Sequence, residues 1–381
     1  MLCDVVDGRV LKSNELFASD PHALQIMLFQ DAFEVTNPLG SARQKHKVLG
    51  VYYTLGNVYV HNRSTVDSIQ LVLLCSEKDC KLFGPEKVFE NLMSDLCELE
   101  STGVCFDGKT FRGSIACVIG DNLGSHFLGG FSENFSSAEH FCRYCNIRKE
   151  DFQRNPLSTA TERTPASYRE SLQELENNPD MQMHNGIKSN SVLNKLAHFH
   201  VCAPGLPPCL AHDLFEGIVD YDLAMYLQFL VKTRKWFCYD FLNRRIVTFP
   251  GESQNKAKVL PTNGTKLGGH AAQNWWLRRF LPVLIHDRVK DPKDEVWQLV
   301  LLLRQVVELV CAPALSESQV AYIKVLIEEY TETRHLLFPL KKLRPKHHYL
   351  LHYADLTLQF GPLIHTWTMR FKSKKEVCSG K

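Results

Sequence analysis

The sequence has no excess of charge of either sign and no long apolar run. Its 44 Lys and Arg residues nearly balance 42 Asp and Glu residues, which gives a net charge of +2. A total this close to zero does not indicate nucleic-acid binding, although a local basic patch would leave the total unchanged. No stretch reaches the ~18 apolar residues that a membrane helix needs, so we expect no membrane partner. The sequence also shows no internal repeat and no low-complexity segment.

A secretory signal is not recognisable either. The first residues, Met1–Asp7, contain neither the basic segment nor the apolar segment of such a signal, so we expect an intracellular protein that is not secreted. In a reducing compartment the 13 cysteines remain thiols. Two cysteines that are close in the sequence are then better interpreted as a metal site than as a disulfide.

The first third of the chain predicts an α/β fold. Apolar runs at 24–31, 48–60, 68–75 and 114–121 have the composition of strands. Between the third and fourth runs, residues 85–100 place apolar side chains at helical spacing. Three strands, a helix and a further strand follow one another in an α/β order.

The rest of the chain is mostly helical in character. Residues 150–190 are polar and predict a surface excursion, whereas 191–340 contain apolar stretches that fit amphipathic or buried helices. Two more helical stretches flank Gly361–Pro362. The helices predicted within the long helical part are 223–231, 275–284, 296–310 and 320–330.

Two acids directly end predicted strands. Asp31 ends the first apolar run, and Asp121 ends the fourth. An α/β sheet usually holds its chemistry at the carboxyl ends of its strands, and two carboxylates that converge there would bind divalent cations. A pair of Mg²⁺ ions about 3.5–4 Å apart activates water and stabilises a leaving oxygen in phosphodiester cleavage. The alternative is that each aspartate is a strand-end cap or a turn former.

A second candidate site combines cysteine and histidine. Cys142 and Cys145 form a CxxC pair, which is half of a tetrahedral zinc site. The best second half lies far along the chain, where His348 and His352 are four positions apart and share a helix face. His347 and His352 are five apart and can also meet. The alternative is a reduced thiol pair and a histidine-rich helix end.

The order and spacing of these residues resemble a known family. The two acids, the CxxC pair, a helical stretch and the late histidines follow one another as in CACTA-like (EnSpm) DNA transposases and in the catalytic core of the V(D)J recombinase. Four segments also resemble animal transposon-encoded proteins: 31–40 (DAFEVTNPLG), 212–217 (HDLFEG), 345–352 and 360–371 (FGPLIHTWTMRF). The resemblance covers nearly the whole chain.

The resemblance implies a ribonuclease-H-like fold, in which a mixed sheet with flanking helices is interrupted by a large, mostly helical insertion. The first part of this core, with the CxxC pair, would span residues 20–150, the insertion 151–345, and the returning segment with the histidines 346–381. It also implies that Asp31 and Asp121 bind Mg²⁺ or Mn²⁺ and that the cysteines and histidines hold a structural Zn²⁺.

The resemblance also reveals a departure from the family pattern. The third acid of the DDE triad is expected within 369–375, where this sequence has Lys372. A lysine brings positive charge to a site meant for cations, so we expect a transposase-like protein that is catalytically impaired. Glu376, one helical turn further on, and Glu216, in segment 212–217, are the two acids that could substitute. The simpler interpretation of segment 212–217 is a helix start that packs the insertion on the core.

Because relatives act on DNA, the resemblance implies DNA as a partner, a nuclear location and a homodimer. Basic groups at 43–47, 278–279, 341–344 and 370–375 are candidates for non-specific phosphate contacts. A competing hypothesis is a non-enzymatic, zinc-stabilised scaffold that binds DNA or protein partners.

Overall fold

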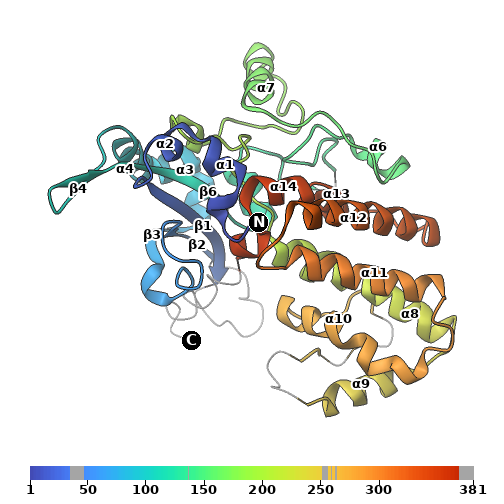
Figure 1. Cartoon of the computed structure of the whole chain (residues 1–381). Coiled ribbons are helices and arrows are strands. Elements are labelled where there is room, and N and C mark those ends of the chain that lie inside the picture. The colour runs from blue at the N-terminus through green and yellow to red at the C-terminus, as the bar shows by residue number, and fades with distance from the viewer. Residues whose placement is uncertain (35–46, 136, 251–255, 259, 262–263, 369–381) are drawn as a thin grey trace.

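A computed structural model describes the chain at residues 1–34, 47–135, 137–250, 256–258, 260–261 and 264–368. Figure 1 shows a sheet formed by the first third of the chain beside a group of helices formed by later residues. The predicted combination of strands and helices is confirmed, since the described chain has a mixed α/β fold. None of the described helices is both long enough and apolar enough to cross a membrane.

The sheet has four strands in the order β3-β2-β1-β6. β1 (Leu24–Glu34) runs antiparallel to β2 (Lys47–Leu55), which in turn runs antiparallel to β3 (Gln70–Ser76). β6 (Gly113–Ile119) pairs with the other edge of β1 and runs parallel to it. All four strands coincide with the apolar runs predicted from the sequence, and the sheet is mixed.

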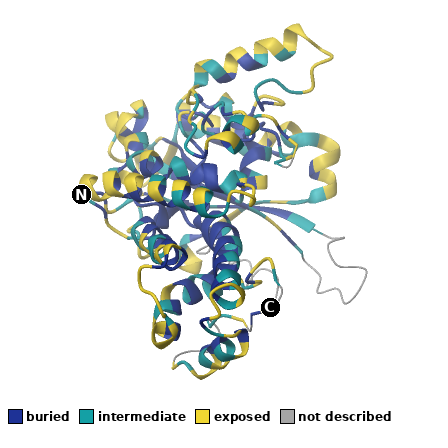
Figure 2. Ribbon diagram, turned by 90° about the vertical axis from the view of Figure 1, so that its right-hand side faces the viewer, coloured by how far each residue is buried: buried dark blue, intermediate teal, exposed yellow. Residues whose placement is uncertain are grey.

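Alternate residues of β1 face opposite sides of the sheet, as strand geometry requires. Ile26 and Leu28 pack into one hydrophobic cluster, whereas Met27 and Phe29 pack into a second one. Both faces of this central strand are therefore buried, which explains why its sequence is a continuous apolar run instead of an alternating one. In Figure 2 the buried residues run through the sheet and the inner helix faces, and the exposed residues lie at the periphery.

The first cluster is covered by α3 (Glu77–Val88) and α4 (Glu90–Ser101). The helical structure begins earlier than the sequence predicted, because the Ser76 side chain caps the N-terminus of α3. Gly84 has a positive φ of 75°, and together with Pro85 it interrupts α3 with a kink. This break falls where the predicted helix was expected to start.

The second cluster is covered by α1 (Arg9–Ser13) and α14 (Tyr353–Phe360), which are far apart in the sequence. The two segments approach closely, since a Cβ atom added to Gly8 would lie 2.3 Å from the carbonyl oxygen of Gln359. Only glycine fits there without a shift of the backbone. The chain thus returns to the sheet after its helical part.

Residues 192–206 also cover the first face of the sheet, although they fall within the segment expected to form the insertion. Leu193 and Phe199 belong to the first cluster. The buried Glu100 of α4 accepts a hydrogen bond from the backbone N–H of Ala197 at 2.7 Å. The helical part that packs away from the sheet therefore begins later than residue 151.

The helical part begins with η5 (Ala211–Leu223), a π-helix that runs directly into α8 (Ala224–Lys232). The helices predicted after it coincide with α10 (Ala271–Ile285), α11 (Glu295–Val310) and α12 (Glu317–Leu337). The other described elements are η1 (Val5–Asp7), α2 (Glu15–Ser19), η3 (Val66–Ser68), β4 (Val104–Phe106), β5 (Lys109–Phe111), α5 (Asn122–Leu128), α6 (Lys149–Arg154), α7 (Pro165–Asn177), η4 (Val192–Lys195), α9 (Tyr239–Thr248), η7 (His286–Arg288), α13 (Pro345–Leu351) and η8 (Leu363–Thr366).

Candidate functional site

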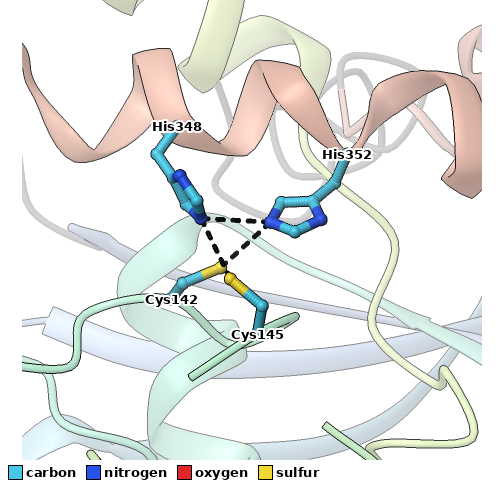
Figure 3. A group of neighbouring side chains, drawn as sticks. All are labelled: Cys142, Cys145, His348 and His352. Atoms are coloured by element: carbon cyan, nitrogen blue, oxygen red, sulfur yellow. Dashed lines mark hydrogen bonds between the residues drawn. The ribbon is translucent and has the colours of Figure 1, made fainter. Parts of the chain in front are cut away.

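Two cysteines and two histidines from distant segments converge beside α13 (Figure 3). Cys142 and Cys145 lie in the loop between α5 and α6, whereas His348 lies in α13 and His352 follows that helix directly. The Cys145 sulfur is 3.1 Å from Nε2 of His348, and the Cys142 sulfur is 3.5 Å from Nε2 of His352. The four donor atoms all lie within 4.8 Å of one another, and all four residues are buried or nearly so. We call this group the Cys₂His₂ cluster.

The Cys₂His₂ cluster fits a tetrahedral zinc ion. Zn–S bonds of about 2.3 Å and Zn–N bonds of about 2.0–2.1 Å place the donors of a tetrahedron roughly 3.3–3.8 Å apart. The two S···N distances given above lie within a few tenths of an ångström of that range, as does the 3.1 Å between the two Nε2 atoms. Two thiolates would also balance the charge of a divalent ion in this buried place. These residues can therefore hold a metal ion, and the donor set is compatible with zinc.

The surroundings of the two sulfurs favour a negative charge on Cys142 and a proton on Cys145. The backbone N–H of Tyr144 donates a hydrogen bond to the Cys142 sulfur at 3.3 Å. Burial raises the pKa of the Cys142 thiol, but the hydrogen bond from Cys145 and the charges of His352 and His348 outweigh burial and hold this pKa well below its usual range. The pKa of Cys145 is raised because its proton is held by the hydrogen bond to Cys142.

His347, which the sequence left as an alternative to His348, is not part of the cluster. Its Nε2 lies 2.9 Å from a carboxylate oxygen of Asp222, and its Nδ1 accepts a hydrogen bond from the backbone N–H of Arg344 at 3.0 Å. The candidate set of three histidines is thereby corrected. Residues four apart share one helix face, so His348 and His352 meet. His347, one position before His348, points in a different direction and contacts Asp222 of η5.

Asp222 lies at the centre of a second buried polar group. The hydroxyl of Tyr330 donates to its carboxylate at 2.7 Å, and Arg334 forms an ion pair with it at 3.3 Å. Burial raises the pKa of Asp222, but the charges and hydrogen bonds of His347 and Arg334 hold this pKa well below its usual range. This group joins η5 to α12 and α13 next to the Cys₂His₂ cluster.

Replacing Asp222 with asparagine is expected to lower the free energy of unfolding by about 3–5 kcal/mol at neutral pH, because Arg334 is left buried without its counter-charge. The folded pKa lies below the unfolded value of about 3.9, so the stabilisation is complete above that pH and is lost as pH falls through the folded pKa. Urea denaturation should therefore show a difference between wild type and Asp222→Asn at pH 5 that shrinks below about pH 4. The exposed Asp180→Asn is the control, and an equal loss in both variants would contradict the prediction.

The two predicted acids, Asp31 and Asp121, occupy equivalent positions relative to the last residue pair between β1 and β6. The last paired residues of the parallel strands β1 and β6 are Phe29 and Ile119. Asp31 and Asp121 each stand two residues beyond their member of that pair. Both acids line one cavity of about 90 Å³, which we call the acid cavity.

Asp121 also caps the N-terminus of α5. One of its carboxylate oxygens accepts a hydrogen bond from the backbone N–H of Gly124 at 2.6 Å. This is the capping role that the sequence left open for each acid. A cap uses one carboxylate oxygen, so the same side chain can bind a cation through the other one.

Four polar residues that sequence reasoning did not select also line the acid cavity: Gln30, Glu77, Lys81 and Glu133. Gln30 is 2% exposed, and neither polar atom of its amide has a hydrogen-bond partner within the described residues. Burying such a group without a partner costs roughly 1–3 kcal/mol, so the cavity is suited to a polar guest. The one signal in the sequence was that Gln30 directly precedes Asp31. Glu77 is ion-paired with Lys81 at 2.9 Å, which brings one positive charge to the cavity.

A buried hydrogen-bond network connects the acid cavity to the cysteine loop. Arg143, between the two cysteines, donates to the side-chain oxygen of Asn122 at 2.7 Å. Asn122, the neighbour of Asp121, donates to a carboxylate oxygen of Asp213 in η5 at 2.5 Å, and the Tyr353 hydroxyl donates to the other oxygen at 3.2 Å. Segment 212–217 thus fastens the helical part to the core through a fully buried carboxylate.

Of the candidates for the third acid, the structure describes Glu216. Glu216 does not line the acid cavity, and its carboxylate accepts a hydrogen bond from the backbone N–H of Ala271, where α10 begins, at 3.3 Å. Its position is that of a helix cap. Lys372 and Glu376 lie outside the described residues.

The candidates for DNA contact differ in exposure. Arg278 is buried and forms an ion pair with Glu308 at 2.9 Å, so it is not a surface cation. Lys341, Lys342 and Arg344 are exposed. Residues 43–46 and 370–375 lie outside the described part of the structure.

Comparison with known proteins adds no relative. No protein-family model matches this sequence, and no curated protein matches it. Function is therefore inferred from the Cys₂His₂ cluster, the acid cavity and the network between them.

Proposed function

We propose that the chain is the core of a transposon-derived, DDE transposase-like protein with a ribonuclease-H-like fold, and that its ability to cut DNA is impaired. The observation that carries the proposal is the placement of Asp31, within β1, and of Asp121, just after the parallel neighbour β6 and at the N-terminus of α5, where both line one cavity. A central β1 with an antiparallel partner on one side and a parallel partner on the other is in keeping with this fold. DNA would be the partner, in the nucleus, and the family expectation is a homodimer.

The acid cavity offers the hard oxygen donors that Mg²⁺ and Mn²⁺ prefer. Asp31 and Asp121 would hold these ions, which would supply charge stabilisation at the phosphate and activation of water. The cap on α5 fixes the orientation of the Asp121 carboxylate.

The Cys₂His₂ cluster has a structural part in this proposal. All four positions are taken by protein donors, which is typical of structural zinc sites, because catalytic sites keep one position open. The cluster ties the loop at Cys142 and Cys145 to the end of α13, and Arg143 within that loop holds Asn122 beside the acid cavity. Zinc would thereby support the geometry of the acids without taking part in the chemistry.

The substitution at residue 372 is the reason for proposing impairment. Where relatives have a glutamate, Lys372 removes one negative charge and adds one positive charge. Both changes weaken the binding of divalent cations by the two aspartates. The second candidate function is the zinc-stabilised scaffold without enzymatic activity, which is favoured by the capping role of Asp121.

Metal affinity tests the proposal directly. Changing Lys372→Glu alters the charge of the site by two units, and if each unit contributes at least about 1.4 kcal/mol, the affinity for Mn²⁺ should rise about 100-fold or more. Adding Asp31→Asn or Asp121→Asn to that variant should remove most of this gain. The affinities can be measured from the free Mn²⁺ signal in electron paramagnetic resonance, with the zinc content determined in the same samples.

Asp95→Asn, which changes an exposed acid of α4, is the matched control in the Lys372→Glu background. It should leave the affinity for Mn²⁺ unchanged. If Lys372→Glu binds Mn²⁺ no better than the wild type, or if the gain survives Asp31→Asn, the proposed triad is wrong and the scaffold is favoured.

A further inference from the structure

A strongly basic recess lies where η5 meets the start of α13. Two adjoining cavities, of about 410 and 370 Å³, share Tyr221 and Arg344 in their walls. The cationic residues that line them are Lys266, Arg334, Lys341, Lys342, Arg344 and Lys346. Among the described residues, Asp222 and Glu216 are the two carboxylates that line the same cavities. We call this pair of cavities the basic recess.

Both carboxylates of the basic recess are already engaged. Asp222 is buried between Arg334 and His347, and Glu216 accepts a hydrogen bond from the backbone where α10 begins. Lys266 and the pair Lys341–Lys342 are exposed, and no described carboxylate lies within ion-pair distance of them. The recess therefore carries several positive charges that the described protein does not neutralise.

Tyr221 gathers two of these cations onto one ring. The guanidinium carbon of Arg344 lies 3.2 Å from the ring centroid, and the Lys266 ammonium lies 4.6 Å from it. Burial raises the pKa of the Tyr221 phenol, but the hydrogen bond to Lys266 and the charge of Arg344 outweigh burial and lower it. The ring thus orients two cations, and its phenol reports the positive potential around them.

The basic recess adjoins the acid cavity along the chain. Asp121 lines the acid cavity, and the next residue, Asn122, lines the recess. Lys346 is held in place at the same wall, because its ammonium donates to the carbonyl oxygen of His212 at 2.6 Å. A linear polyanion that extends from the two aspartates across Asn122 would meet these cations.

From this placement we infer that the basic recess binds successive phosphate groups of a nucleic-acid strand that continues from the acid cavity past Asn122 to Tyr221 and Arg344. The inference rests on the proposed function, because the aspartates identify the polyanion as a phosphodiester chain. Arginine matches the geometry of phosphate oxygens, and lysine contributes charge without sequence preference. The recess would therefore hold the strand without recognising its sequence.

The salt dependence of binding measures how many cations contact phosphates. The affinity of the full-length protein for a fluorescent single-stranded oligonucleotide can be measured between 50 and 300 mM salt, without added Mg²⁺ or Mn²⁺. Each lost phosphate contact should lower the slope of log affinity against log salt by about 0.7. The double variant Lys341→Gln/Lys342→Gln should therefore lose about 1.4 from the slope and about tenfold or more in affinity near 0.1 M salt. Lys266→Gln, at the opposite wall, should lose about half as much from the slope.

The matched control is the double variant Lys109→Gln/Lys324→Gln, which removes two exposed lysines from β5 and α12 outside the recess. It should keep the wild-type slope. If the recess variants keep that slope as well, the inference is overturned while the Mn²⁺ test of the proposed function stands by itself. Displacement of the strand by poly-glutamate of equal charge would also overturn it, since the recess would then bind acidic peptides. An absence of salt-dependent binding by the wild type would overturn it too.

Discussion

Replacing Cys145 with serine is expected to lower the melting temperature by roughly 5 °C or more and to abolish the binding of a metal ion by the Cys₂His₂ cluster. Serine keeps the shape of the side chain but is a far poorer zinc ligand than a thiolate. Because a metal site of this kind forms only in the folded chain, the free energy of metal binding contributes to folding. A loss above about 4 kcal/mol, at about 1.2 °C per kcal/mol for 381 residues with an unfolding entropy of about 2.1 cal/mol/K per residue, accounts for the expected shift.

Differential scanning fluorimetry and metal analysis of the purified protein measure both effects. Cys238→Ser, which changes an exposed cysteine, should alter neither the melting temperature nor the metal content. If Cys145→Ser proves insoluble, treatment of the wild type with a zinc chelator should give the same loss of stability, reversible on adding zinc. Full metal content in soluble Cys145→Ser, or no response to the chelator, would rule out a zinc-dependent fold.

Lys372→Glu should turn an inactive protein into one that nicks DNA in the presence of Mn²⁺. The variant removes a repulsive charge and adds a metal-binding one, and a unit-charge interaction near 4 Å contributes up to about 4 kcal/mol at the effective dielectric of a protein. Each 1.36 kcal/mol corresponds to a tenfold change in rate, so the expected gain is up to about 1,000-fold for each unit of charge. The direction of the effect is unusual, because most substitutions in a site lower activity.

The conversion of supercoiled plasmid to its open form gives a sensitive measurement of nicking. Lys375→Glu makes the same change of charge nearby and should stay inactive. Lys372→Glu combined with Asp31→Asn should also be inactive, which excludes a contaminating nuclease. Robust nicking by the wild type would disprove the impairment, and an inactive Lys372→Glu would remove residue 372 from the proposed site.

Much of the sheet could be predicted from the sequence because burial of both faces leaves a strong local signal. The apolar run before Asp31 and the one before Asp121 are long enough to identify strands, and the acid at each end is visible directly. The pairing of those strands was not visible, since it depends on contacts between residues far apart. The hydrophobic pattern also gave no account of α5, whose N-terminus depends on the Asp121 cap and the Gly124 backbone.

The sequence predicted the residues of the metal cluster except for the choice between His347 and His348. The CxxC spacing fixes two donors, but His348 and His347 lie four and five residues before His352, and either could meet it. The choice between them is made by Asp222, which binds His347 from η5 and turns it away from the cluster. A contact between segments that are so distant in the sequence has no local signature.

The covering of the sheet by α14 has a consequence for biosynthesis. All four strands of the sheet have been synthesised once Ile119 is added, but α14, which belongs to the cluster that includes Met27 and Phe29 on one face of the sheet, follows only after the long helical part. During synthesis that apolar face therefore stays open while the long helical part is translated. Contacts of such large sequence separation form slowly and leave intermediates prone to aggregation. A chain that ends before residue 353 would retain its strands but would permanently expose part of that face.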